Sequence, residues 1–269
     1  MDYRIARPSP LLSEYVKQYW AMESCLPANR SHIQRIVPTG MSDLTFYLGD
    51  RPVSLDDRKP LAGSAVLTGQ QGDFFDIRVS GSMDLFSILF LPQGLPVFFD
   101  VPSSELYNQT VTLSDVCRQD AGEIEALLRE ARTFEERIRR VEAYLVKRLR
   151  NNRSRDHFGR IRHSIGLINR SRGLIGIDEL AGEACLGRKQ FERIFSRYVG
   201  ASPRQFLKTV RFQSSIDLKA RDPGANLTDI TYRCGYYDQS HMVNDFRKLA
   251  GMSPTQFFQD CAPFSDYFH

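Results

Sequence analysis

Two segments in the last third of the chain carry polar side chains that match the hydrogen-bonding groups of DNA. Arg pairs with guanine, Gln and Asn pair with adenine, Glu accepts from cytosine, and Lys or Arg near a helix end suits phosphate. We therefore take the polar side chains of both segments as candidate DNA contacts: Arg188, Lys189, Gln190, Glu192, Arg193, Arg197, Gln239, Ser240, His241, Asn244, Arg247 and Lys248.

The two segments occupy equivalent places in an internal repeat that covers residues 178–206 and 228–257. Both copies close with the pattern Phe-x4-Gly-x-Ser-Pro-x-Gln-Phe, in which Gly200 matches Gly251 at an offset of 51 residues. Residues near the start of each copy match at an offset of 50, so a one-residue slip falls in or near a turn. Such a repeat indicates two copies of one supersecondary unit.

Each copy predicts a short helix, a tight turn that contains Gly, and a second helix, which is the helix-turn-helix pattern. The predicted helices of the two copies are 177–184 with 188–198, and 227–234 with 238–249. The Ser-Pro-x-Gln sequence that follows places Ser at an N-cap and Pro at the first helical position. It predicts a helix over 203–220, about 25 Å long, that joins the copies.

The charge distribution and the cysteine content are compatible with two DNA-binding helix-turn-helix units, but they would not indicate them on their own. Residues 1–152 hold 18 Lys and Arg against 20 Asp and Glu, whereas residues 153–260 hold 18 against 11. The excess positive charge therefore lies where a polyanion would bind. Five cysteines at long spacings form no metal or disulfide motif, and no run reaches the length of a membrane span. We expect a cytoplasmic protein with no membrane partner, metal or cofactor.

The N-terminal part has a different pattern. Short apolar runs bounded by Gly, Pro and Asp predict strands at 44–50, 64–69, 74–81 and 83–92. No helical stretches alternate with them, so we expect an antiparallel barrel or sandwich. Helical pieces are expected at 10–20 and near 93–99.

Between residues 119 and 150, apolar residues recur at three- and four-residue spacing, which predicts two amphipathic helices that meet near Arg132. The predicted fold class is α+β. A β-rich effector or dimerisation domain spans 1–118, a helical connector spans 119–152, and an all-α domain with two helix-turn-helix units spans 153–260.

The C-terminal part resembles the AraC/XylS family of transcriptional regulators. The resemblance covers about 100 residues and is carried by both copies of the repeat. The matching residues are Ile177–Ala181, Phe191–Phe195, Gly200–Pro203, Arg211, Ile230, Gly235-Tyr236, Ser240–Met242, Phe246, Gly251–Pro254 and Phe257.

The resemblance implies a two-lobed helical domain that places two recognition helices in adjacent major-groove segments. By position, the base-facing residues would be Lys189, Gln190, Glu192, Arg193, Gln239, Ser240, His241 and Asn244. Two residues depart from the family pattern, because Gly187 replaces the usual Ser at an N-cap and Asn244 replaces a common Arg. We expect the first helix to supply more of the base discrimination and the second to supply more of the anchoring to the DNA backbone.

The N-terminal segments that begin at Arg7, Arg35, Leu67 and Leu91 resemble the β-rich sensor domains of uncharacterised members of this family. The resemblance implies effector sensing, dimerisation, or both, and does not name an effector. The expected partners are double-stranded promoter or operator DNA and a small-molecule or protein effector, with RNA polymerase and a second copy of the chain as further candidates.

Two alternatives remain open at this point. The N-terminal part could bind no small ligand and serve only dimerisation or protein binding. The chain could instead be a β-barrel enzyme fused to a DNA-binding domain. Against the enzyme, His32 is the only histidine before residue 157, and no GxSxG, GxGxxG or phosphate-loop motif occurs. We therefore expect a non-enzymatic protein. Its aromatic pocket candidates are Tyr15, Tyr19, Trp20, Phe46 and Phe90, although aromatic residues of this kind belong to a plain core more often than to a pocket.

Overall fold

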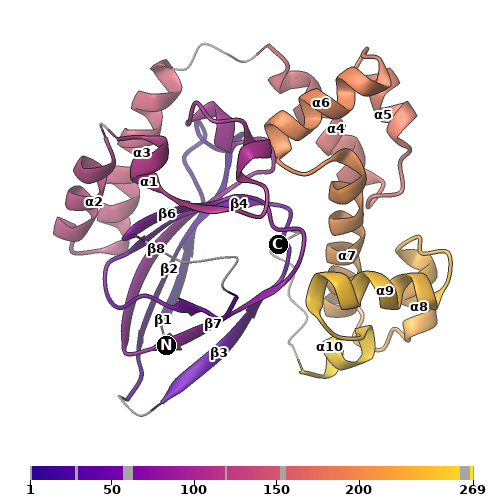
Figure 1. Ribbon diagram of the computed structural model, residues 1–269, viewed down its shortest axis with the longest axis horizontal. Coiled ribbons are helices and arrows are strands. Elements are labelled where there is room, and N and C mark those ends of the chain that lie inside the picture. The colour runs from indigo at the N-terminus through magenta and orange to yellow at the C-terminus, as the bar shows by residue number, and fades with distance from the viewer. Residues whose placement is uncertain are drawn as a thin grey trace.

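The computed structural model describes residues 2–27, 30–56, 63–118, 120–151, 156–260 and 267–268. The N-terminal part is antiparallel β structure, as expected, and the C-terminal part is helical (Figure 1). The strands are β1 Asp2–Ala6, β2 Val16–Cys25, β3 Ser31–Ile36, β4 Ser42–Tyr47, β5 Val53–Ser54, β6 Ala65–Thr68, β7 Phe75–Ser80, β8 Ser82–Phe90 and β9 Thr110–Thr112.

The strands form two sheets that are closely linked along the chain. The larger sheet has the order β1-β2-β8-β4-β6-β9, and the smaller has the order β3-β7-β5. Since β2 leads into β3, β4 into β5 and β7 into β8, the three central strands of the larger sheet connect directly to the smaller one. The predicted strands correspond to β4, β6, β7 and β8.

The helix expected at 10–20 is wrong. Residues 10–15 form turns, and β2 begins at Val16. The helical spacing of Tyr15, Val16 and Tyr19 is coincidental, because β2 pairs with β8 along almost its whole length, from Val16 opposite Phe90 to Cys25 opposite Ser82. Near 93–99 a short 3-10 helix, η1 (Leu95–Val97), does occur. A second, η2, spans Ser103–Leu106.

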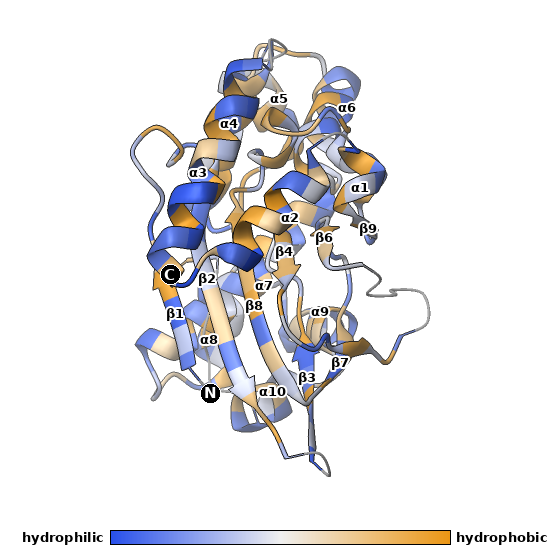
Figure 2. Cartoon of the chain, turned by 90° about the vertical axis from the view of Figure 1, so that its left-hand side faces the viewer, coloured by the Kyte–Doolittle hydropathy of each residue, from blue (hydrophilic) through white to orange (hydrophobic). Residues whose placement is uncertain are grey.

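One face of the larger sheet is covered by helices. After α1 (Leu113–Val116), α2 (Ala121–Glu130) lies in front of β8 and β4, and α3 (Phe134–Asn151) lies in front of β2 (Figure 2). Their apolar stripes pack on the sheet, where the rings of Phe134 and Phe86 are 5.9 Å apart. The break between α2 and α3 falls where expected, and the backbone N–H of Arg132 donates to Glu136.

The opposite face of the same sheet carries a polar cluster. Thr45 donates to Asp43 over 3.0 Å and contacts the hydroxyl of Ser87 at 2.8 Å. Thr68, across the strand pair from Asp43, bonds to the same carboxyl group. Burial nevertheless raises the pKa of Asp43 to about 6, because desolvation outweighs these hydrogen bonds.

Replacing this carboxyl group by an amide is therefore expected to stabilise the fold at neutral pH. A carboxyl group whose pKa is raised on folding favours the folded state at low pH and loses that advantage as pH rises through 4 to 6. With a discount for its partial exposure, Asp43→Asn should add about 1–2 kcal/mol to the free energy of unfolding near pH 7.5. Paired urea titrations of both proteins measure the difference, which should vanish near pH 4. If the difference in unfolding free energy were the same at all pH values, it would not arise from the ionisation of Asp43.

The C-terminal part consists of seven helices within 156–260. They are α4 Phe158–Arg170, α5 Ile177–Glu183, α6 Arg188–Val199, α7 Pro203–Arg221, α8 Leu227–Arg233, α9 Gln239–Ala250 and α10 Pro254–Asp260. Within the described residues no helix has the length and apolar character needed to span a membrane. The same part of the chain contains no group of three metal-ligating side chains.

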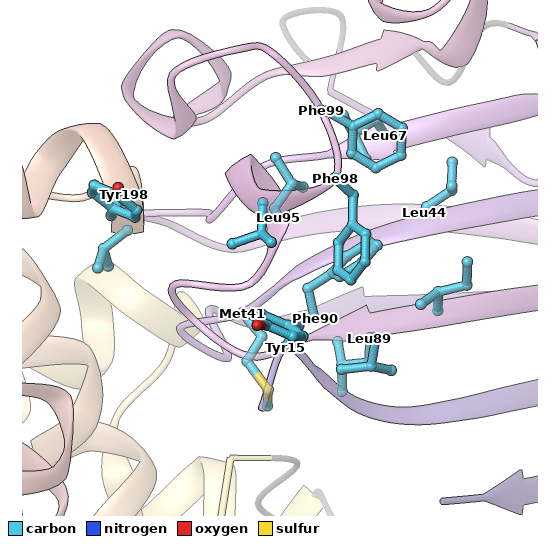
Figure 3. Close-up of a cluster of buried hydrophobic side chains, with 14 of the residues drawn as sticks. Tyr15, Met41, Leu44, Leu67, Leu89, Phe90, Leu95, Phe98, Phe99 and Tyr198 are labelled. Atoms are coloured by element: carbon cyan, nitrogen blue, oxygen red, sulfur yellow. The ribbon is translucent and has the colours of Figure 1, made fainter. Parts of the chain in front are cut away.

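The apolar interior is divided unequally between the two helix-turn-helix units. One large core runs from the β-sheet through α4, α5, α6 and the first half of α7. In Figure 3, Leu95 lies between Tyr198 of α6 and Phe98, and Phe98 packs against Phe90. All four residues belong to this core. The five aromatic pocket candidates pack in or against it, with Trp20 only partly buried. A separate core lies within the second half of α7 and α8, α9 and α10.

Candidate nucleic-acid interface

The first helix-turn-helix unit is formed by α5 and α6, within one residue of the predicted bounds. Leu180 and Ala181 bury the inner side of α5. The turn holds Cys185 at a φ of 53°, and Gly187 at the N-cap of α6 provides no side-chain hydrogen bond. The apolar residues of α6 face the core, so its other side is left to solvent.

The solvent side of α6 carries the six predicted contacts of the first segment. Five of them are exposed, and Glu192 is half-buried. Arg188 forms ion pairs with Asp178 at 3.0 Å and with Glu192 at 3.3 Å, and the hydrogen bond to Glu192 raises the pKa of Arg188. Within the described chain, Lys189 and Arg193 form no ion pair. These two cations are therefore more available to a polyanion than Arg188.

The second helix-turn-helix unit repeats this arrangement in α8 and α9. Asn226 caps α8 and Asp238 caps α9, each accepting a hydrogen bond from a backbone N–H three residues later. Gly235 takes a φ of 71° in the turn, equivalent to Cys185 in the first copy. Ile230 and Met242 both belong to the separate core. Unlike α6, α9 thus begins with a charged side-chain cap.

Three of the predicted contacts on α9 are exposed, namely Ser240, Asn244 and Arg247. Within the described chain their side chains form no hydrogen bond or ion pair. Gln239 is exposed but donates to Thr228 over 2.8 Å. His241 is half-buried, with its ring 5.3 Å from that of Tyr236.

Lys248 occupies a different position from the other residues of its segment. It lines an open cleft between α9 and the β-sheet, together with Asp56, Asp73 and Asp76. This end of the helix faces the acidic N-terminal part, whereas Gln239 and Ser240 lie at the opposite end of α9. Lys248 thus lies away from the face that we assign to bases.

The connecting helix α7 joins the two units, and its length limits how far apart they lie. Its N-terminus has the predicted capping box, in which Ser202 accepts from the backbone of Gln205 and Gln205 bonds back to Ser202. Nineteen residues correspond to about 28 Å of helix. Figure 1 shows α6 beside the upper part of α7 and α9 beside its lower part. This separation approaches the ~34 Å between successive major-groove segments on one face of DNA.

Two exposed aromatic residues beside α9 were not predicted. Tyr237, which precedes the N-cap Asp238, is 87% exposed, and Tyr232 on α8 is 64% exposed. A tyrosine hydroxyl can donate to a phosphate oxygen. The signal in the sequence was a second aromatic residue directly after Tyr236 in the turn, at the same end of the recognition helix as Gln239.

Two family models match separate parts of the chain. Residues 180–260 match a family model described as a helix-turn-helix domain. Residues 4–112 match a domain of unknown function, DUF6597.

Curated relatives match only the C-terminal part. An uncharacterized HTH-type transcriptional regulator from Haemophilus influenzae is 35% identical over 81 residues, 30% of this chain and 27% of the relative. The probable transcriptional regulator LumQ from Photobacterium leiognathi is 32% identical over 31% of this chain and 33% of its own length. The activator RhaS from Escherichia coli is 31% identical over 29% of this chain and 27% of its own length. Each match thus spans a third or less of the relative.

Solved structures similar to this chain have low sequence identity and TM-scores below 0.5. The DNA-binding domain of AdpA, in complex with a target DNA, is 22% identical with a TM-score of 0.35 and covers 37% of this chain and 90% of that domain. ToxT from Vibrio cholerae is 12% identical with a TM-score of 0.45, over 86% of this chain and 96% of its own.

The family matches and the residues of the repeat agree on how the chain is classified. The helix-turn-helix model covers both copies of the repeat, and the curated relatives that match there are transcriptional regulators. The C-terminal part of the chain therefore belongs to the AraC/XylS-type helix-turn-helix proteins, and the N-terminal part belongs to a domain family of unknown function.

Proposed function

We propose that the chain is a sequence-specific DNA-binding regulator of transcription. The observation that carries this proposal is the paired arrangement of α6 and α9, each with an exposed polar face, at the two ends of one rigid connecting helix. A single chain with two such faces can contact two adjacent major-groove segments and so recognise an asymmetric site. A rigid connector of about 28 Å would favour DNA that bends toward the protein.

The side chains divide into two roles in this proposal. Base contacts come from Lys189, Gln190, Glu192, Arg193, Gln239, Ser240, His241 and Asn244. Phosphate contacts come from Arg188, Arg197 and Arg247, whereas Lys248, which was expected to join them, lines the acidic cleft beside the sheet and is not assigned to DNA. Because Arg193 is exposed and has no ion pair within the described chain, its guanidinium can pair with guanine through two parallel hydrogen bonds. Asn244 can pair with adenine in the same way.

The division of labour along the chain is part of the proposal. Residues 153–260 bind DNA, residues 119–152 connect, and residues 1–118 receive an effector or a partner. We infer a non-enzymatic role because the relatives of the C-terminal part are transcriptional regulators. RNA polymerase is the expected further partner on promoter DNA.

A dimerisation role for residues 1–118 is favoured by the edge strand β1. This strand is hydrogen-bonded only to β2 among the described strands, and Tyr3 and Ile5 are about half exposed on it. An edge strand with half-exposed apolar side chains is suited to pairing with a second copy. Light scattering of the full chain, compared with Ile5→Lys, tests this role.

Mapping of the DNA bound across the genome tests the function directly, and the salt dependence of binding tests its physical basis. If about six phosphates are neutralised, affinity for a recovered site should fall about 10³-fold between roughly 50 and 200 mM salt. Fluorescence anisotropy with a labelled duplex measures this fall. A flat salt response, or the absence of enriched sequences, would reject the proposal.

A further inference from the structure

Both recognition helices end against the N-terminal part of the chain, and they do so at equivalent positions of the repeat. Gly200 and Gly251 close α6 and α9 with φ angles of 97° and 72°. A Cβ atom on Gly200 would lie 3.1 Å from the carbonyl oxygen of Ser103, and one on Gly251 would lie 2.4 Å from the ring of Phe74. Glycine is therefore needed at both sites for the backbone angle and for the close approach.

The two contacts differ in kind. The end of α6 lies on η2, where Tyr198 and Val199 belong to the large core shared with the β-sheet. The second unit has its own core, against which Val37 packs from the N-terminal part. Apolar burial therefore fixes the first unit to the sheet, while the second unit depends more on polar contacts.

The main polar contact of the second unit is made by Arg35 on β3. Two of its nitrogens donate to the two oxygens of Asp76, each over 2.8 Å, and this pairing lowers the pKa of Asp76. Its Nη1 donates to the backbone oxygen of Ala250 over 3.1 Å, and its guanidinium lies 4.4 Å from the centre of the Phe74 ring.

Ala250 is the last residue of α9, so its carbonyl has no partner within the helix. A cation at a helix C-terminus also interacts favourably with the helix dipole. Arg35 thus supplies a C-cap for the second recognition helix from the other part of the chain. A second contact lies three residues beyond Arg35 in the sequence. There the side-chain amide of Gln213 on α7 donates a buried hydrogen bond of 2.7 Å to the backbone carbonyl of Pro38.

We propose that Arg35 is a positioning residue for the second helix-turn-helix unit, and that its bond to the end of α9 sets the placement of α9 relative to α6. The inference rests on the proposed function, because it concerns the spacing of two DNA-contacting faces. The Arg35–Asp76 pair is about one-quarter to one-third exposed, so a ligand or partner at β3 and β7 can reach it. Loss of the contact leaves α7, with the packing of Val37 and Phe74, to orient the second unit.

The test is selection of double-stranded DNA from a random pool by the full chain and by Arg35→Ala. The wild type should enrich two sequence elements at one fixed spacing. Arg35→Ala should enrich the same two elements with spacings spread by about one base pair or more on either side. Arg78→Ala is the matched control, because Arg78 is an exposed arginine on β7 that lies outside this contact, and it should retain the wild-type spacing.

A structural defect alone would not produce this pattern, since it lowers the yield of all sites without changing their spacing. Arg35→Lys keeps the charge but loses the paired hydrogen bonds, and should give an intermediate spread. An Arg35→Ala distribution identical to that of the wild type overturns the inference, as does loss of one sequence element in a folded variant. Failure of the wild type to enrich any sequence would reject the proposed function instead.

Discussion

Phe206→Ala is expected to lower the free energy of unfolding by about 3–5 kcal/mol, the usual cost of removing a fully buried aromatic side chain. Phe206 is fully buried on α7, with its ring 5.6 Å from Phe195 and 6.1 Å from Tyr267. Its ring also lies close to Gly40 on the sheet side, where an added Cβ atom would be 3.3 Å from it. The cavity would thus open where the first helix-turn-helix unit meets the N-terminal part.

Because this core is shared, the sheet and the first unit should lose stability together. Trp20 on β2 is the only tryptophan of the chain, so its fluorescence reports on the sheet, while circular dichroism at helical wavelengths reports on the helices. In Phe206→Ala both urea transitions should shift to lower concentration by similar amounts.

Phe257→Ala is the matched control, since Phe257 is buried in the separate core of the second unit. It should destabilise part of the helical signal and leave the tryptophan transition near that of the wild type. If Phe206→Ala shifted only the helical signal, the sheet and the first unit would unfold independently, and the shared core would have no cooperative role.

The helical half of this fold could be predicted closely, because its signals are local. Capping residues and the repeat lie within a few residues of the ends that they determine, and α7 ends one residue beyond the predicted 203–220. The β half depends on distant pairing. Tyr15, Val16 and Tyr19, at the start of β2, are spaced as in a helix, and only the pairing with β8, far later in the chain, makes the segment a strand.

For the candidate interface, the sequence predicts the local pattern of polar residues but not their partners from other elements. The sequence indicates which side of α6 and α9 is polar, and that side is the exposed one. It does not indicate that Asp178 engages Arg188, that Thr228 engages Gln239, or that Lys248 faces acidic residues of the sheet. Those partners come from other elements, so their effect depends on tertiary packing rather than on local pattern.

The contact of Arg35 with Ala250 is the clearest example of a feature that the sequence alone does not predict. The two residues are 215 positions apart, and neither has a sequence signal for the other. The sequence marks Gly251 as a helix terminator, which is a local property. That the same glycine also admits the ring of Phe74 from the sheet follows only from the three-dimensional arrangement.

Arg193→Ala is expected to weaken binding of a selected DNA site by about 1–3 kcal/mol, which corresponds to about 5- to 150-fold in affinity. Arg193 is exposed on α6 beyond the first turn, and no ion pair within the described residues would have to break before it meets a base. A lost pair of hydrogen bonds to guanine should also relax the preference at one base pair. Competition with single-base variants of the site measures both effects.

Arg188→Ala and Arg197→Ala provide the comparison. Arg188 is already paired with Asp178 and Glu192, so its removal should cost less than that of Arg193. Arg197, in the last turn of α6, is assigned to phosphate, and its removal should weaken all sequences alike and reduce the salt slope by about one ion. Equal affinity of wild type and Arg193→Ala, with unchanged preference at every position, would reject Arg193 as a base contact and count against α6 as a base-contacting helix.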